Sequence, residues 1–212
     1  SEAVEVGKRS GATIQVSHLK ATGSNNYGLV NGAFDLLHRA RTEGINVHCD
    51  VYPYTAGSTF LAMVTPPWSH EGGFDELARR LGAREKRDRI RYEMLNDSVE
   101  WNGLFRAAGS WDRILISSVV APELTKYEGS SIAAIAAAEG KDQFETAFDL
   151  LEADKGRSMM VVFLMDEQDV SAVLKYPWSV IGSDQLLVTG REQRGHPRAY
   201  GTYAKVLGPL VR

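Results

Sequence analysis

Apolar residues in the first fifty positions alternate between strand and helix patterns. A β-branched run predicts a strand at residues 11–20, and apolar positions at helical spacing predict a helix at residues 27–43. A second β-branched run starts after Gly44, which closes the helix, and stops at Pro53 because proline donates no hydrogen bond to a sheet. A strand, a helix and a strand form a βαβ unit, so we expect the two strands to pair in parallel.

Beyond residue 57 the pattern changes to loops rich in proline and glycine, followed by shorter elements. A strongly charged helical region, which Gly82 is expected to split, comes first, and its mixed charges favour a solvated face. The elements predicted for this part are helical regions at 74–96, 132–138 and 143–152 and a strand at 114–120. A continuous apolar strand follows, then a helix with Asp166 as its N-cap, and then a last strand.

Four of the predicted strands can be joined by right-handed helical crossovers. They occupy residues 11–18, 45–49, 159–165 and 178–182. We therefore expect an α/β fold, the C-terminal half of a (β/α)8 TIM-like barrel with an inserted, mostly helical region. The expected division is a first barrel βαβ segment, an insertion-containing region, and the last barrel strands with the start of a final helix, at residues 1–57, 58–155 and 156–212. We also expect the chain to be a piece of a longer polypeptide.

Composition narrows the choice of protein class. The 212 residues are 43% hydrophobic with a formal net charge of -3, and no basic stripe favours a nucleic-acid or membrane-surface partner. No apolar run is long enough to span a bilayer, and the N-terminus lacks the order of a signal peptide. The single cysteine, Cys49, excludes an intrachain disulfide and fits a reducing compartment. We expect a soluble, cytoplasmic protein.

Residues with metal-binding chemistry lie where the predicted barrel strands end. His18 and His48 are 30 residues apart, the length of one βα repeat, so adjacent parallel strands are expected to bring their imidazoles side by side. Neutral imidazole nitrogens suit a zinc-class ion. Either residue could instead be a packed, hydrogen-bonded core histidine, and the pattern alone leaves both interpretations open.

Further polar residues surround the same strand ends. Asp184 could take a proton from metal-bound water and pass it to a leaving amine, or it could cap a turn. Arg198 could bind a substrate carboxylate through two hydrogen bonds, or it could tie down its own loop. Asp50 could accept a hydrogen bond from a ligating imidazole, whereas Tyr52 fits packing and loop closure better than catalysis.

Several strings in the chain resemble the N-acyl-D-amino-acid deacylase (D-aminoacylase) family of the amidohydrolase superfamily. They are S-H-L-K at residues 17–20, D-V-Y-P-Y-T-A-G-S-T at residues 50–59, G-S-D at residues 182–184 and H-P-R-A-Y-G-T-Y at residues 196–203. The resemblance extends over essentially the whole chain. It implies a metal-dependent (β/α)8 barrel that hydrolyses the amide of an N-acylated D-amino acid, with zinc as the cofactor and a small N-acyl amino acid as the substrate.

The resemblance also implies roles for single residues. His18 and His48 match the family's metal histidines of the fifth and sixth strands, and Asp184 matches the catalytic aspartate of the eighth. The substrate-binding residues implied by the matched motifs are Lys20, Tyr52 and Arg198. The family's His-x-His pair and its metal-binding cysteine have no counterpart here, and Cys49 does not match that cysteine.

Two alternatives stay open beside a deacylase. The chain could belong to another amidohydrolase, such as a cyclic-amide or dipeptide hydrolase. It could also be an isolated fragment without catalytic activity, because half of a barrel lacks part of the metal site. Half a barrel exposes two sheet edges and an apolar lumen, so we expect such a fragment to associate with itself.

Overall fold

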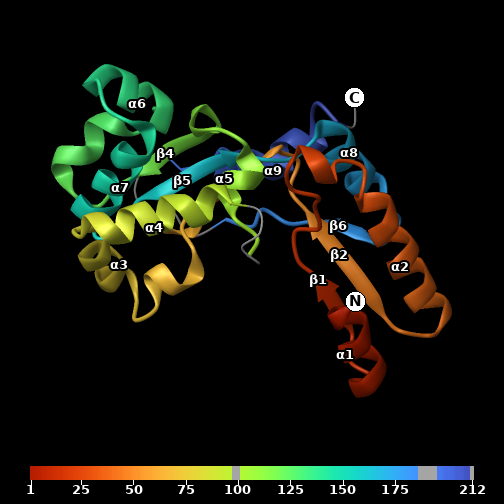
Figure 1. The fold of residues 1–212 in the computed structure, drawn as a ribbon. Helices are drawn as coiled ribbons and strands as arrows, with labels where there is room; N and C mark the ends of the chain where they lie inside the picture. Colours follow the sequence, from red (N-terminus) through yellow and green to blue (C-terminus); the bar gives the residue numbers. More distant parts are fainter. Residues whose placement is uncertain (97–100, 186–194, 211–212) are drawn as a thin grey trace. The chain divides into compact units, whose positions relative to one another are not determined.

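The protein is described by a computed structural model that covers residues 1–96, 101–185 and 195–210 (Figure 1). The chain divides into two compact units. Unit 1 is built from stretches within Ser1–Thr55, Met165–Val188 and Pro197–Arg212, and unit 2 from stretches within Ala56–Leu164 and Thr189–His196. Each unit has its own sheet, and the candidate site residues belong to unit 1.

Unit 1 contains a parallel sheet of three strands in the order β1-β2-β6. The strands are β1 (Ile14–Val16), β2 (Val47–Val51) and β6 (Ser179–Ile181). The predicted parallel pairing of the first two strands is confirmed, with Ile14 opposite Val47 and Val16 opposite Cys49. In Figure 1, α2 (Val30–Thr42) runs beside β2, as a βαβ connection requires.

The two faces of this sheet differ. Val47, Cys49 and Val51 of β2 are buried and pack with residues of α2 and of α8 (Glu167–Lys175). His48 and Asp50 alternate with them and are only half-buried, because successive side chains of a strand point to opposite faces. Helices therefore cover one face, and the other face carries the polar side chains.

Local sequence signals explain the helix ends of unit 1. α1 (Glu2–Ser10) ends at Gly11, whose φ of 69° is the left-handed conformation that glycine adopts without strain. α8 begins where predicted, because the Asp166 side chain accepts a hydrogen bond from the Gln168 backbone N–H at 2.8 Å. The last helix of the unit, α9 (Arg198–Leu207), carries part of the candidate site.

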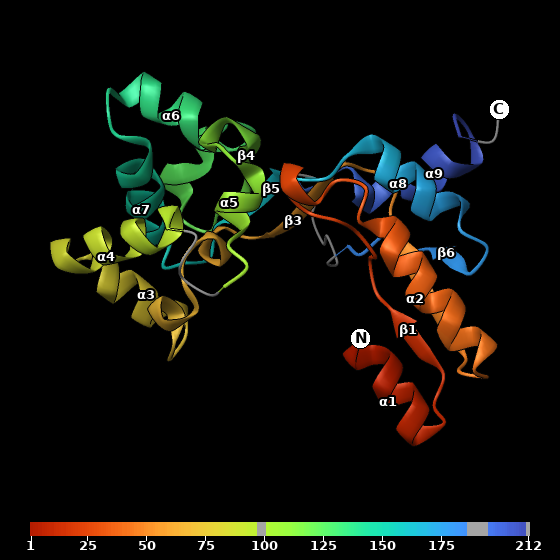
Figure 2. The ribbon, with the colours of Figure 1, turned by 45° about the vertical axis from the view of Figure 1, so that its right-hand side comes forward.

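Unit 2 contains an antiparallel sheet in the order β3-β5-β4, and Figure 2 shows β3 and β5 next to each other. Its strands are β3 (Ala56–Phe60), β4 (Ile114–Ser118) and β5 (Met159–Phe163). Its helices are α3 (Phe74–Leu81), α4 (Arg84–Leu95), α5 (Leu104–Ala108), α6 (Ile132–Glu139) and α7 (Gln143–Ala153). Apolar side chains from these helices and strands form the core, and Phe148, Leu81 and Ile116 are fully buried.

Short 3₁₀ helices complete the described part of the chain. They are η1 (Ser24–Asn26), η2 (Leu61–Val64), η3 (Pro67–His70), η4 (Trp111–Arg113) and η5 (Pro122–Tyr127). None of the helices within the described ranges is long and apolar enough to cross a membrane.

The expectation that residues 159–165 form a strand of the parallel sheet is wrong. β5 is the central strand of the antiparallel sheet, where Met160 and Val162 are buried. A continuous apolar run is typical of any strand whose two faces are both covered. The run therefore could not distinguish a parallel from an antiparallel partner strand. The described part of unit 1 therefore has three parallel strands rather than four.

Candidate functional site

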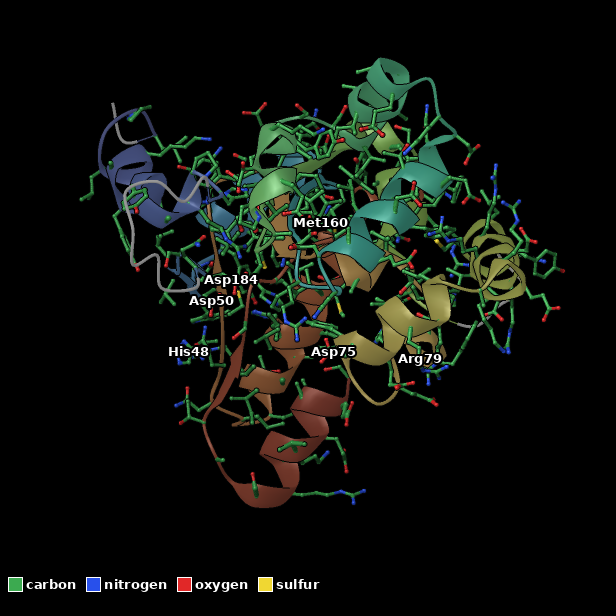
Figure 3. All side chains as sticks on the ribbon, turned by 90° about the vertical axis from the view of Figure 1, so that its left-hand side faces the viewer. His48, Asp50, Asp75, Arg79, Met160 and Asp184 are labelled. Atoms are coloured by element: carbon green, nitrogen blue, oxygen red, sulfur yellow. The ribbon has the colours of Figure 1, made fainter. Side chains whose placement is uncertain are left out.

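The candidate site lies at the carboxyl ends of the three parallel strands of unit 1. His18 follows β1 by two residues, Asp184 follows β6 by three, and Asp50 is the fourth residue of β2, the strand between them. Figure 3 labels Asp50 and Asp184 at the same end of the unit. Sites of α/β proteins are commonly built at this edge of a parallel sheet.

His18 and Asp184 share an unusual backbone conformation. Their φ angles are 43° and 48°, and Lys155 is the one other non-glycine residue of the described ranges with a positive φ. This left-handed conformation costs on the order of 1–3 kcal/mol for a non-glycine residue, and such residues cluster at functional sites. Surrounding contacts must therefore keep both residues in place.

The contacts around His18 come from Asp50. The His18 backbone N–H donates a hydrogen bond to Asp50 Oδ1 at 2.7 Å, and the Leu19 N–H donates to the Asp50 carbonyl oxygen at 2.9 Å. Asp50 Oδ2 accepts a third hydrogen bond, from Gln15 Nε2, at 2.9 Å. The His18 side chain itself is exposed, so its imidazole is accessible to a ligand.

The contacts around Asp184 come from α9. Arg198 Nη1 donates to Asp184 Oδ2 at 2.8 Å, and Arg198 Nε donates to Gln185 Oε1 at 3.3 Å. The Arg198 side chain is 4% exposed and that of Asp184 is 38% exposed, so a buried cation supports a carboxylate that still reaches solvent. These hydrogen bonds connect the start of α9 to the segment after β6.

Helix α9 is fixed against the segment after β2. Lys205 Nζ donates to the Pro53 carbonyl oxygen at 2.7 Å. A Cβ at Gly201 would collide with the Tyr54 hydroxyl, so glycine permits the close approach of the helix. These contacts position Arg198, the first residue of α9, beside Asp184.

Two cations flank Tyr52. Lys20 Nζ lies 5.0 Å and Arg198 Cζ lies 4.8 Å from the centre of the Tyr52 ring, which is 2% exposed. Burial raises the pKa of Tyr52 to about 12, although Arg198 acts in the opposite direction. Lys20, Tyr52 and Arg198, the three residues predicted to bind substrate, are thus brought together.

Burial also shifts the pKa of Lys20. The pKa of the Lys20 amine is lowered to about 8, chiefly by burial, and Arg198 acts in the same direction. The carboxylates of Asp184 and Asp50 act in the opposite direction. Lys20 therefore belongs to the same electrostatic cluster as the carboxylates at the strand ends.

His48 lies elsewhere on the sheet. It is the second residue of β2, opposite Gln15, and one of its ring nitrogens, Nε2, shares a hydrogen bond with Asn46 Oδ1 at 2.9 Å. The strand was expected to end near His48 to Asp50, and β2 ends at Val51, so His48 lies inside the strand. His18 lies beyond the end of β1, and its backbone N–H bonds the side chain of Asp50, which is two residues further along β2 than His48. In Figure 3, Asp50 is labelled next to Asp184, and His48 lies farther from Asp184.

Two residues of the candidate site, Asp50 and Gln15, were not placed correctly from the sequence. Asp50 was expected to bond a ligating imidazole, but its carboxylate accepts the backbone N–H of His18. Gln15 was not singled out, although its position opposite His48 places it on the face that carries Asp50. Strand alternation was the available signal, since it places these polar side chains on one face.

The donor atoms present fit part of a zinc site. The imidazole of His18 and the carboxylate of Asp184 are ligand types that zinc accepts. Within residues 1–96, 101–185 and 195–210, no three or more His, Cys, Asp or Glu side chains gather around a point that could hold a metal ion. Cys49 is buried on the helix-covered face, and burial raises the pKa of its thiol. A complete coordination sphere would need ligands from outside this part of the chain.

Comparison with known sequences adds independent information. No protein-family model matches the chain. It is 27% identical to a D-aminoacylase and 28% identical to an N-acyl-D-glutamate deacylase, both of Alcaligenes xylosoxydans xylosoxydans, over 211 residues in each case. Each match covers 100% of this chain but 33% of the relative, so the chain spans about a third of the length of the relatives that it matches.

The solved structures that match the chain include an N-acyl-D-glutamate deacylase and a D-aminoacylase. One is an N-acyl-D-glutamate deacylase from Bordetella bronchiseptica complexed with zinc and a phosphonate inhibitor that mimics the tetrahedral intermediate of the reaction. It has a TM-score of 0.68 and 26% identity, covering 100% of this chain and 34% of that one. A D-aminoacylase with a binuclear metal centre matches with a TM-score of 0.65 and 26% identity, covering 100% of this chain and 33% of that structure.

Proposed function

Because this chain is a relative of the D-aminoacylase amidohydrolases along its whole length, we propose that it is part of a zinc-dependent enzyme that hydrolyses the amide bond of N-acyl-D-amino acids. The observation that carries the proposal is the convergence of His18, Asp184, Lys20 and Arg198 at one edge of a parallel sheet. That edge supplies an imidazole, a carboxylate and two cations to one place.

The chain is proposed to form the C-terminal half of a (β/α)8 barrel. Its three described parallel strands lie in chain order across the sheet, β1-β2-β6, and this order supports their being part of such a barrel. Helices cover one face, whereas Val180 on the opposite face is 52% exposed beside Asp50. Further strands of a longer chain would cover this second face.

His18 is the proposed metal ligand of this half. Its imidazole is exposed, and its backbone is fixed by hydrogen bonds from the His18 and Leu19 N–H groups to Asp50. Zinc, when bound, would lower the pKa of a water ligand to about 7 and polarise the substrate carbonyl. No residue of the described ranges completes the ligand set, so further ligands are proposed to come from outside them.

Asp184 is proposed to carry the proton. Its Oδ2 accepts the hydrogen bond from Arg198, so proton uptake falls to Oδ1. After taking a proton there from the attacking water, the carboxyl group would deliver it to the departing amine nitrogen. The buried Arg198 would keep the carboxyl group in one orientation between the two transfers.

Lys20 and Arg198 are proposed to bind the carboxylate of the amino-acid part of the substrate. Both lie against Tyr52, which limits their movement. Burial strengthens the attraction between a cation and a carboxylate, because less water screens the charges. Arg198 has five N–H donors, and Nη1 and Nε already donate to Asp184 and Gln185, whereas the Lys20 ammonium group offers three donors to the substrate carboxylate.

The metal role of His48 remains a prediction, and in the structure its imidazole bonds Asn46. Changing it to alanine in the full-length protein tests the assignment. If both histidines are ligands, His48→Ala and His18→Ala both lose zinc. Retention of zinc by His48→Ala, with loss in His18→Ala, would reject the role of His48.

The reaction itself is tested with the full-length protein and a panel of N-acyl-D-amino acids, N-acyl-L-amino acids, cyclic imides and dipeptides. We expect hydrolysis of the N-acyl-D-amino acids and little of the others. Preferred hydrolysis of cyclic imides or dipeptides would support the other amidohydrolase interpretation. A metal-loaded protein that hydrolyses nothing in the panel would contradict the proposal.

A further inference from the structure

One carboxylate at the strand ends has no part in the proposed chemistry. Asp50 lies in the central strand β2, half-buried, between the segments that leave β1 and β6. Both of its carboxylate oxygens accept hydrogen bonds from within unit 1, Oδ1 from the His18 N–H and Oδ2 from Gln15 Nε2. With both oxygens engaged, Asp50 is suited to hold structure rather than to exchange protons.

Asp50 binds the chain where it turns into the left-handed conformation. The N–H groups of His18 and Leu19 both donate to Asp50, one to the side chain and one to the backbone carbonyl. His18 between these contacts has a φ of 43°. Two successive N–H groups donate to one residue, Asp50, and these hydrogen bonds fix the peptide planes on both sides of the His18 Cα and thereby set the direction of its side chain.

The Asp50 carboxylate is itself confined. Gln15 Nε2 holds Oδ2 from the β1 side, and a Cβ built on Gly182 would lie 3.4 Å from Oδ1 on the β6 side. The space therefore accepts a side chain of the length of aspartate. A longer carboxylate would have to displace the β6 exit or abandon the His18 N–H.

We propose that Asp50 is a positioning residue that fixes the left-handed turn at His18, so that the imidazole keeps the orientation it needs as a metal ligand. The inference rests on the proposed function, because it assigns Asp50 a purpose only if His18 binds the metal. It assigns the effect of Asp50 to its shape and acceptor oxygen rather than to its charge.

Two substitutions separate shape from charge. Asp50→Asn keeps the shape and the oxygen that accepts the His18 N–H, and Gln15 can turn its amide to match the new NH₂ group. Asp50→Glu keeps the charge but moves the carboxylate outward by one methylene group. Positioning therefore predicts that Asp50→Asn resembles the wild type and Asp50→Glu does not, whereas an electrostatic role predicts the reverse order.

The experiment measures zinc affinity of the full-length protein by competition with a chelator, together with the absorption spectrum of its Co²⁺ form. We expect Asp50→Glu and Asp50→Ala to weaken zinc binding by about 10- to 100-fold and to change the Co²⁺ spectrum. We expect Asp50→Asn to stay within about threefold of the wild type, since it keeps that hydrogen bond. Val180→Ala, opposite Asp50 in the sheet register, is the matched control and should change neither quantity.

The outcomes distinguish this inference from the proposed function. If His18→Ala loses zinc while Asp50→Glu and Asp50→Ala bind it as the wild type does, the positioning role is overturned and the function stands. If His18→Ala retains zinc, the proposed function fails first. Should Asp50→Ala not fold by circular dichroism, the comparison of Asp50→Glu with Asp50→Asn decides alone, and equal affinities overturn the inference.

Discussion

At the scale of single residues, Lys20 links the site to pH. Its amine is surrounded by protein on the side of Tyr52 and interacts with Asp184 and Asp50. Burial lowers its pKa from 10.5 to about 8, so Lys20 loses its charge within the pH range of ordinary enzyme assays. The unfolded chain binds more protons than the folded one between those two values, and the free energy of unfolding should therefore rise with pH from about 8 to about 10.5.

Lys20→Arg tests whether the charge of Lys20 contributes to substrate binding. We expect the KM of the full-length enzyme for an N-acyl-D-amino acid to rise as pH passes about 8, because neutral Lys20 no longer attracts the substrate carboxylate. A guanidinium group stays protonated in this range, so Lys20→Arg should remove the rise. KM measured from pH 6 to 10 for both proteins tests this, and identical pH profiles would contradict the role of Lys20.

The site residues differ in how far the sequence could place them. Lys20, Tyr52 and Arg198 follow from the matched motifs, and the structure brings them together. His48 was placed at a strand end because the strand was expected to end near His48 to Asp50, whereas His48 is the second residue of β2, which extends to Val51. The Asp50 bond to the His18 N–H could not be predicted, because it depends on a positive φ that no local pattern requires of histidine.

At the scale of elements, α4 and α7 of unit 2 are joined by charge. Arg87 of α4 donates to Glu145, Asp149 and Glu152 of α7 at 2.7 to 2.8 Å, and its side chain is 13% exposed. The mixed charges of α4 were expected to form a solvated face. Arg87 shows that one side of this face instead fastens two helices together.

We expect Arg87→Ala to lower the free energy of unfolding by about 2 kcal/mol, because three carboxylates lose their common partner, although their partial exposure limits the cost. Arg84→Ala is the matched control on the same helix. The Arg84 side chain is 71% exposed, so its loss should cost less than about 0.5 kcal/mol. Urea denaturation measures both, and equal losses would show that the burial of Arg87 adds nothing.

The elements themselves were predicted unevenly. Gly82 separates α3 from α4 as expected, and α7 and α8 follow from apolar spacing and from the Asp166 cap. The strand β3 was not predicted, because Gly57 and Ser58 give it no apolar alternation. The antiparallel sheet depends on the pairing of β5 with β3 and β4, which lie far from it in the sequence, and periodicity carries no information on such partners.

At the scale of the whole molecule, unit 1 presents a sheet face that its helices do not cover. Val180, half-exposed on this face, has polar neighbours on the next strands in Asp50 and Gln15. The edge strands of a three-stranded sheet also carry unpaired backbone groups, which can pair with another chain. An exposed face and open edges of this kind favour association with another chain.

We accordingly expect the isolated 212-residue chain to form dimers or larger assemblies at micromolar concentration. The full-length protein, in which further barrel strands would cover the face, should not associate through it. Sedimentation velocity of the two proteins at matched concentration makes the comparison. A 212-residue chain that stays monomeric across the range would show that the open face needs no cover.

The proposed function depends above all on His18 as a metal ligand at the end of β1, and the zinc content of the full-length His18→Ala protein tests it most directly. Purified wild-type and variant proteins would be compared for bound zinc per polypeptide. We predict that the wild type holds zinc and that the folded variant has lost most of it. A folded His18→Ala protein with the zinc content of the wild type would contradict the account.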